Sequence, residues 1–371
     1  MTVERVLVTG EDGVANFGRV GRRLISLTLA WKAEGGYQSE QELRTYVDVP
    51  VGEIALVKHP YARSILADES QINVTLSNVP SGAPFVALQP CGWGANGIAE
   101  FRGVRVGPED VQTDGRLSLL ATAQGLEVSL FYSPSSYSFL LDEELVYGAT
   151  YRIPSTEGGA AWRESALQPW ETSDETPLLL LDISGFRGGV RYNLGGWYSN
   201  TAAVRGSAVF LDEFPVDYYG IYSVSCKAGR GTCTNVHRRV QAMPSVLAVT
   251  TPDYGFEYAS YDPVTRMIHW SLREATAGYG IQIGHPSTVE PTFWVVWLRP
   301  DATSWSIPDL PSPVREWVGD DPFREVALSV LDSSVVEGFD DWWRNYGSRG
   351  KALLWEEADT ISGHVSLALS Q

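Results

Sequence analysis

The sequence predicts an all-β protein built of tandem small β-sandwich modules, with one short helix near its C-terminal end. Aromatic residues are abundant, with 13 Trp, 17 Tyr and 12 Phe, and aromatic and β-branched side chains favour strands. The 36 glycines and 21 prolines divide the chain into short segments. Within many of these segments, such as residues 24–31, apolar and polar residues alternate as in a half-buried strand; residues 293–298 are a shorter, continuous apolar strand.

The chain is longer than one hydrophobic core usually organises. A length of 371 residues predicts between two and four domains. Changes in composition and polar, Gly-rich stretches indicate four modules, and residues 155–176 are expected to be a polar linker or long loop. The predicted modules cover residues 1–58, 59–172, 173–252 and 253–371.

A hairpin signature lies near the start of the chain. Residues 9–20 have the pattern of a strand, a turn at Asp12-Gly13 and a second strand. This segment resembles the T-x-x-D-G-x-x-x-F-x-x-V segment of carboxypeptidase-regulatory-like, prealbumin-type β-sandwich modules, and residues 46–52 resemble the end of such a module. The resemblance implies a spacer or stalk of a bacterial surface protein. Such modules have a further strand before the motif, so we expect this module to be truncated or its open edge to be covered by the next domain.

A second resemblance lies in the third module. Residues 217–226 (D-Y-Y-G-I-Y-S-V-S-C) resemble the corner and following strand of immunoglobulin-like domains, where a tyrosine bonds back to the backbone. Cys226 stands four residues after Tyr222 instead of two, and no cysteine precedes it in the module. The resemblance therefore implies a β-sandwich, but not the inter-sheet disulfide of that family.

The chain has three cysteines, Cys91, Cys226 and Cys233. Cys226 and Cys233 flank a Gly-rich turn, so two facing strands would bring their sulfurs within bridging distance. A disulfide that closes so short a loop would stabilise the fold by about 2 kcal/mol. The alternative is two unpaired thiols, and the sequence does not choose between them. We expect the remaining Cys91 to be buried.

The charge of the chain argues against two classes of partner. Acidic residues outnumber basic ones by 45 to 28, which gives a net charge of −17. An anionic surface repels phosphate backbones and acidic lipids, so we expect no nucleic acid and no membrane surface as partner. No apolar run is long enough to span a membrane, and the first residues have no signal-peptide core. A sheet-rich chain this poor in lysine and methionine nevertheless suggests an extracellular or cell-surface protein. Any export signal of such a protein would lie upstream of this sequence, which does not contain one.

One motif matches a cofactor-binding pattern by its letters alone. Residues 92–97 (G-W-G-A-N-G) fit the dinucleotide fingerprint, but the β-type residues that follow favour a flexible hairpin loop over a phosphate-binding helix. The five histidines lack metal-ligand spacing, and the pairs Asp320-Asp321 and Asp340-Asp341 lack the spacing of a calcium loop. The sequence therefore predicts no catalytic, cofactor-binding or metal-binding residue.

One helix is expected over residues 333–346, with Ser333 as its N-cap and Gly347 at its end. This helix contains Trp342 and Trp343, which could contact carbohydrate as part of a platform for sugar rings. Core packing is the alternative, because adjacent helical residues cannot both face one side.

Together these features predict a non-enzymatic structural or adhesion scaffold at the cell surface. The expected partners are other surface proteins or glycans, and assembly into a homo-oligomer is compatible with the sequence. Two alternatives remain: a carbohydrate-binding protein that uses exposed tryptophans, and a hydrolase whose acidic residues converge in a cleft.

Overall fold

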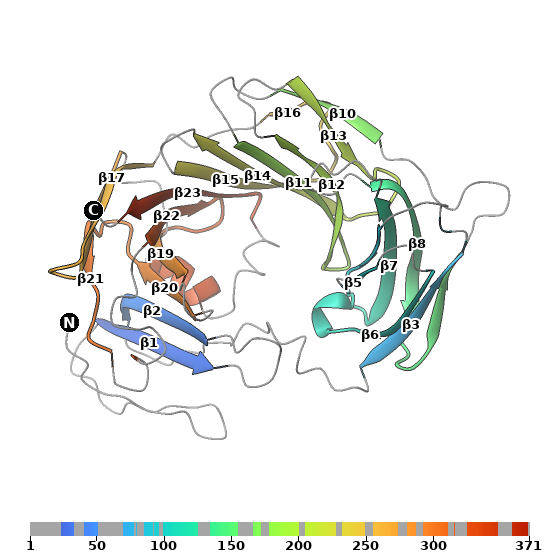
Figure 1. Cartoon of the computed structure of the whole chain (residues 1–371), viewed down its shortest axis with the longest axis horizontal. Helices are drawn as coiled ribbons and strands as arrows, with labels where there is room; N and C mark the ends of the chain where they lie inside the picture. Colours follow the sequence, from blue (N-terminus) through green and yellow to red (C-terminus); the bar gives the residue numbers. More distant parts are fainter. Residues whose placement is uncertain are drawn as a thin grey trace. The chain divides into compact units, whose positions relative to one another are not determined.

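The described residues are mostly β-structure in the computed structural model (Figure 1), which confirms the all-β class. Helical structure among the described residues is confined to short turns. No helix in this part of the chain is both long and apolar enough to cross a membrane. The structure describes residues 24–32, 41–50, 70–77, 79, 85–91, 93–95, 99–124, 134–154, 166–171, 178–199, 205–227, 232–248, 255–273, 280–286, 292–310, 315, 325–347 and 358–369.

The chain divides into two compact units. Unit 1 comprises Met1–His59, Gly231–Thr234 and Pro252–Gln371, and unit 2 comprises Pro60–Arg230 and Asn235–Thr251. The module boundaries expected after residues 58 and 252 adjoin the limits of these units, whereas the boundary expected after residue 172 lies inside unit 2. The first and last predicted modules therefore belong to one unit.

Unit 1 contains strands in the order β1-β2-β20-β19-β22-β23 and a separate sheet in the order β17-β18-β21. The bounds are β1 Leu24–Lys32, β2 Gln41–Pro50, β17 Phe256–Asp262, β18 Met267–Leu272, β19 Gly280–Pro286, β20 Thr292–Leu298, β21 Ser304–Ser306, β22 Glu325–Ser333, α2 Phe339–Trp342, a π-helical turn Trp343–Gly347 and β23 Thr360–Leu369.

The β1–β2 hairpin pairs with a strand that is about 250 residues away in the sequence. β2 runs parallel to β20, with Gln41 opposite Thr292 and Tyr46 opposite Trp297. Strand β2 of this hairpin is therefore paired with the C-terminal part of the chain, and β1 is the terminal strand of the sheet among the described residues. Residues 9–20, which carry the hairpin signature, lie outside the described residues.

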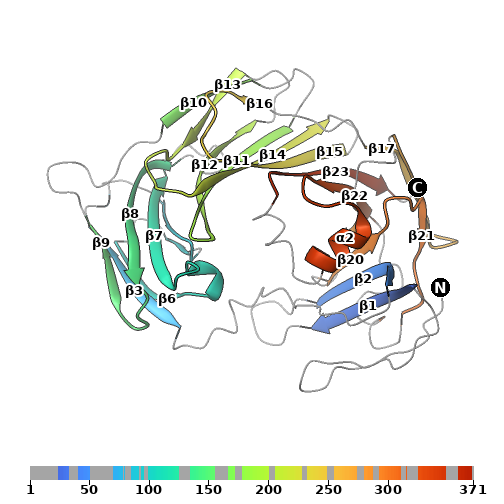
Figure 2. The same cartoon turned by 180° about the vertical axis from the view of Figure 1, so that it is seen from behind.

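Strand β20 is buried on both of its faces, which explains its continuous apolar sequence. Trp294 and Val296 belong to a core that includes Ile268 of the β17-β18-β21 sheet. Val295 and Trp297 point to the opposite face and pack with residues of α2 and of the turn after it. Figure 2 shows α2 next to β20. Because successive side chains of a strand point to opposite faces, the large side chains of β20 pack into two separate cores.

The helix expected over residues 333–346 is shorter than predicted. Ser333 ends β22 and does not cap a helix, although its Oγ accepts a hydrogen bond from the Val335 N–H at 3.4 Å. Helical residues begin only at Phe339, after Gly338 with a φ of 95°. The alternating pattern of β22 continues to Ser333, and Gly338 supplies the left-handed conformation that separates strand from helix.

Unit 2 contains strands in the orders β6-β3-β9, β5-β4-β7-β8 and β15-β14-β11-β12-β13-β10-β16. The bounds are β3 Gln71–Leu76, β4 Phe85–Gln89, β5 Trp93–Ala95, β6 Glu100–Arg105, a 3₁₀ turn Pro108–Asp110, β7 Arg116–Gln124, β8 Pro134–Glu144, β9 Thr150–Ile153, β10 Ala166–Glu171, β11 Leu178–Arg187, β12 Val190–Ser199, β13 Arg205–Phe210, β14 Tyr218–Lys227, β15 Thr232–Val240 and β16 Leu247–Ala248. Of β15, the residues from Asn235 onward belong to this unit.

Three layers of sheet pack on one another in unit 2, and β7 lies in the middle layer. Leu119 of β7 shares a core with Ile72 and other residues of the β6-β3-β9 sheet. Its neighbour Leu120 points the other way, into a core shared with Ile183 of β11. The segment 155–176, expected as a linker or long loop, contains β10, which pairs with β13.

Candidate functional site: a polar network in unit 2

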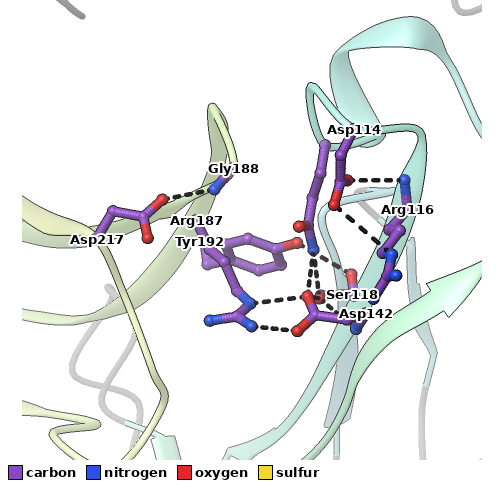
Figure 3. A network of polar contacts seen from close by, with 9 residues as sticks. Asp114, Arg116, Ser118, Asp142, Arg187, Gly188, Tyr192 and Asp217 are labelled. Atoms are coloured by element: carbon purple, nitrogen blue, oxygen red, sulfur yellow. Dashed lines mark hydrogen bonds and ion pairs between the residues drawn. The ribbon is translucent and has the colours of Figure 1, made fainter.

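A network of polar side chains links four segments of unit 2 (Figure 3). It joins the loop before β7, the β7–β8 pair, the β11–β12 hairpin and the residue before β14. Its members are Gln112, Asp114, Arg116, Ser118, Asp142, Arg187, Gly188, Tyr192 and Asp217.

Two glycines shape the hairpin tip that enters the network. Gly188 and Gly189 connect Arg187 to Val190, and both have left-handed φ values, 54° and 84°. A two-residue loop with positive φ at both positions matches the twist of antiparallel strands, and glycine adopts it without steric cost. A Cβ at Gly188 would lie 2.8 Å from the Gln112 side chain. The tip therefore approaches the β7 loop closely because it has no side chain there.

An ion pair forms the centre of the network. The Arg187 guanidinium donates from Nε to Asp142 Oδ1 at 3.1 Å and from a terminal nitrogen to Asp142 Oδ2. The two side chains are 21% and 32% exposed. The hydrogen bonds from Arg187 and then from Gln112 hold the pKa of Asp142 below its usual value. Asp142 has a φ of 56°, a conformation that aspartate tolerates better than most residues.

Buried polar groups surround the ion pair on the β7 side. Ser118 Oγ accepts hydrogen bonds from Gln112 Nε2 at 2.6 Å and from the Asp142 N–H at 3.0 Å. The Tyr192 hydroxyl donates to the Ser118 carbonyl at 3.0 Å, and burial raises the pKa of this phenol. Each of these buried groups therefore has a protein partner, as buried polar groups require.

The backbone of the hairpin tip is fixed from both sides. Asp217 Oδ2 accepts a hydrogen bond from the Gly188 N–H at 2.7 Å. The Thr113 N–H donates to the Gly188 carbonyl at 2.9 Å. One glycine thus joins the loop before β7 to the residue that precedes β14.

The arrangement of these groups fits a structural tie better than a reaction centre. Ser118 is fully buried, and the network contains no histidine that could remove its proton. Asp142 is held by Arg187 and so is a weak base. Among the described residues, no group of three or more His, Cys, Asp or Glu side chains is placed to hold a metal ion.

The tryptophans predicted to contact carbohydrate lie in a core. Trp342 is 5% exposed and Trp343 is 7% exposed. The Trp342 ring stacks on Trp297 at 4.3 Å between centroids, and the Trp343 ring lies 4.9 Å from that of Tyr46. These contacts fit core packing and not a platform for sugars, because residues of β2 and β20 cover the ring faces on which a sugar would stack.

Two of the three cysteines form a disulfide, and the third is a buried free thiol. Cys226 of β14 and Cys233 of β15 are disulfide-bonded. Cys91 is free and buried, with 1% of its surface exposed.

The segment with the dinucleotide letters has no helix in its described part. Trp93–Ala95 forms β5, which pairs with β4, and Glu100–Arg105 forms β6 in a different sheet. The segment is therefore a connection between two sheets and not the loop of a hairpin. Asp340 of the acidic pairs binds Arg299 at 2.6 Å, and Asp341 accepts from Asn345 at 2.7 Å.

Sequence reasoning missed the Arg187–Asp142 pair. The two residues lie 45 positions apart and no motif connects them. The Gly188-Gly189 dipeptide, between two strand-like segments, was the one signal that marked this hairpin.

Comparisons of the chain with protein-family models, with curated proteins and with solved structures found no match. Function is therefore inferred from the residues themselves.

Proposed function

We propose that the chain is a non-enzymatic structural scaffold of the cell surface or the extracellular space. The observation that carries this proposal is the self-contained polar network of unit 2. Its buried serine, glutamine and tyrosine bond to one another and to the backbone, and the carboxylate–guanidinium pair at its centre, Asp142–Arg187, is closed. Such a network fixes the geometry between layers of sheet and offers no reactive group to a substrate.

Two further features support a location outside the cytoplasm. The Cys226–Cys233 disulfide is of a kind that persists in oxidising compartments and is rare in cytosolic proteins. A net charge of −17 favours solubility over adhesion to anionic membranes.

The proposal extends to the kind of module from which the scaffold is built. We infer that the stacked layers derive from β-sandwich modules of the prealbumin-like and immunoglobulin-like type. Sheets that share an apolar core support this, such as the core of Ile72 and Leu119 in unit 2 and that of Ile268 and Trp294 in unit 1. The proposed partners of such a scaffold are other surface proteins or glycans. They would be bound by a single chain or by a homo-oligomer.

Protease treatment of intact host cells tests the location. In a parallel sample of intact cells, free thiols are first blocked with a maleimide that does not cross membranes. The cells are then lysed, the disulfides are reduced, and the newly exposed thiols are labelled with a second maleimide. We expect proteinase K to digest the chain on intact cells, and Cys226 and Cys233 to be labelled only after reduction. A chain that resists the protease until lysis, with both thiols reactive from the start, would overturn the proposal.

An activity screen tests the absence of catalysis. The purified full chain is incubated with chromogenic ester, peptide and glycoside substrates, and we expect no turnover above the rate without protein. The hydrolase alternative predicts turnover that is lost on mutation of a carboxylate. The arginines paired with Asp142, Asp182 and Asp340 argue against these three residues as the catalytic carboxylates of such a hydrolase.

A further inference from the structure

A second polar cluster lies on one face of the β15-β14-β11-β12 part of unit 2. In β11, Leu181 and Ile183 point into the core shared with β7, so Asp182 and Ser184 point to the opposite face. Tyr222 of β14 stands opposite Asp182 in the register. We call the following set the polar face: Asp182, Ser184, Arg191, Tyr222, Asn235 and His237.

A donor and an acceptor are held side by side on the polar face. Arg191 donates from Nε to Ser184 Oγ at 2.8 Å and from a terminal nitrogen to Asp182 Oδ2 at 3.2 Å. Ser184 Oγ in turn donates to Asp182 Oδ1 at 3.1 Å. The Arg191 side chain is 51% exposed and that of Asp182 is 23% exposed. These contacts use two of the five N–H donors of the guanidinium, so further donors face solvent beside a partly accessible carboxylate.

The rest of the polar face is neutral at neutral pH. His237 is 4% exposed, and burial followed by the nearby Arg191 charge lowers its pKa to about 4. Its imidazole lies over Gly220, where an added Cβ would be 2.7 Å from Nε2. Burial raises the pKa of Tyr222, which also interacts with Asn235. Within this set, one negative and one positive charge therefore balance among uncharged polar groups, and the Arg239 guanidinium lies apart from them, over the Tyr218 ring.

We propose that the polar face binds a neutral saccharide through a pair of adjacent hydroxyl groups. A hydroxyl both donates and accepts hydrogen bonds, so two neighbouring hydroxyls can donate to Asp182 and accept from Arg191 at the same time. The negative charge of Asp182 would repel a carboxylate ligand, and the positive charge of Arg191 would repel an ammonium ligand. The Ser184 bridge fixes both groups before the ligand arrives, which lowers the entropic cost of binding.

This inference goes beyond the scaffold function and replaces the buried tryptophans with a different carbohydrate contact. The two proposals fail independently. If no saccharide binds, only the assignment of the polar face is wrong. If the chain turns over a substrate, only the proposal of a non-enzymatic scaffold is wrong.

The test uses the purified full chain on an array of neutral and acidic oligosaccharides, followed by calorimetric titration with the neutral oligosaccharide that binds best. We expect Asp182→Asn and Arg191→Lys each to weaken binding by about tenfold or more, because each removes one half of the donor–acceptor pair. The matched control is Glu100→Gln, which alters an exposed carboxylate that pairs with Arg102 at 3.0 Å in the same unit. Binding by the control should be unchanged.

Two further measurements keep the outcome decisive. Thermal unfolding shows whether each variant is folded, and Tyr222→Phe, which removes only a hydroxyl, tests the face again if Asp182→Asn does not fold. Hydrogen exchange should show ligand-dependent protection in Leu178–Arg187 and Tyr218–Lys227. The inference is wrong if no neutral saccharide binds more tightly than about 10 mM, if only acidic glycans bind, or if folded variants bind as well as the control.

Discussion

Both units consist of stacked β-sheets, but different kinds of contact hold the sheets together in each unit. In unit 1 the first and last thirds of the sequence meet, and aromatic rings fill the junction: Trp294 is fully buried and donates from Nε1 to Thr45 Oγ1 at 3.0 Å. Unit 2 is nearly continuous in sequence, and a polar network crosses between its layers at Arg187 and Asp142.

The difference shows what each kind of contact contributes. Bringing distant segments together costs loop entropy that grows only slowly with length, and large apolar surfaces can offset it. Polar contacts add little net energy but demand a defined geometry. Unit 1 therefore depends on burial to assemble at all, whereas in unit 2 the Gly188 tip uses hydrogen bonds to set how neighbouring layers meet.

Removal of residues 1–50 is the strongest test of this comparison. The deletion takes away β1 and β2 and exposes the Trp294 side of β20. We expect hydrogen exchange to show loss of protection in β19, β20 and β22, while β11 and β14 of unit 2 stay protected. If β20 remains protected in the truncated chain, the N-terminal hairpin is an accessory of unit 1 and not part of its core.

A single substitution in the same junction should have the next largest effect. Trp294→Ala removes a fully buried indole and its hydrogen bond to Thr45, and we expect it to cost about 3–5 kcal/mol of unfolding free energy. Trp294→Phe is the control, because it keeps an aromatic ring and loses the N–H donor. Urea denaturation of both variants measures the difference; equal losses would mean that the hydrogen bond outweighs the packing.

These features differ in how far they can be predicted from sequence. Residues 24–31 and 293–298 were expected as strands and form β1 and β20, because alternation and apolar runs are local signals. The parallel pairing of β2 with β20 could not be predicted, since no residue pattern in either strand identifies the other as its partner. The helix over residues 333–346 was predicted too long because the pattern of β22 continues to Ser333.

The polar network was beyond sequence reasoning for a related reason. Asp142 and Arg187 are ordinary surface-type residues until the layers of unit 2 place them together. The buried positions of Trp342 and Trp343 likewise depend on Tyr46 and Trp297, which lie far away in the chain. Local patterns identified the elements, whereas contacts between elements decided which residues are accessible.

The pH dependence of stability should distinguish the units. His237 in unit 2 has a folded-state pKa of about 4, below its ordinary value of 6.5. Its contribution is complete above pH 6.5 and is lost as the pH falls toward 4, because protonation then favours the unfolded chain. The loss approaches about 3 kcal/mol at about 1.4 kcal/mol per pH unit. In unit 1, burial raises the pKa of Asp332, so protonation of this carboxyl at acidic pH favours the folded unit.

Urea unfolding at pH 7, 6 and 5 measures this contribution, with His237→Gln as the comparison. We expect the variant to lose less stability than the natural chain over this interval. Asp182 faces the same cluster, and because burial raises its pKa it offsets part of the effect. Parallel stability curves for the two chains would show that His237 is not the source of acid sensitivity.

The smallest expected effect concerns the polar tie itself. Arg187→Met removes the partner of Asp142 but keeps much of the aliphatic stem, and hydrogen bonds to charged groups contribute about 2 kcal/mol. Arg102→Met is the control, because Arg102 pairs with Glu100 at 3.0 Å while 83% exposed, and such surface pairs contribute little. Urea denaturation should therefore show a measurable loss for the first variant and none for the second.

The double variant Arg187→Met with Asp142→Asn separates the ion pair from its surroundings. If the pair acts as a unit, the double variant should lose less stability than the sum of the two single losses, because the second substitution removes a charge that the first left unmatched. Asp142 would still be replaced by a group that Gln112 and Ser118 can bind. Strict additivity would mean that solvent screens Asp142, which is 32% exposed, and that the layers of unit 2 are joined by their apolar cores in the same way as those of unit 1.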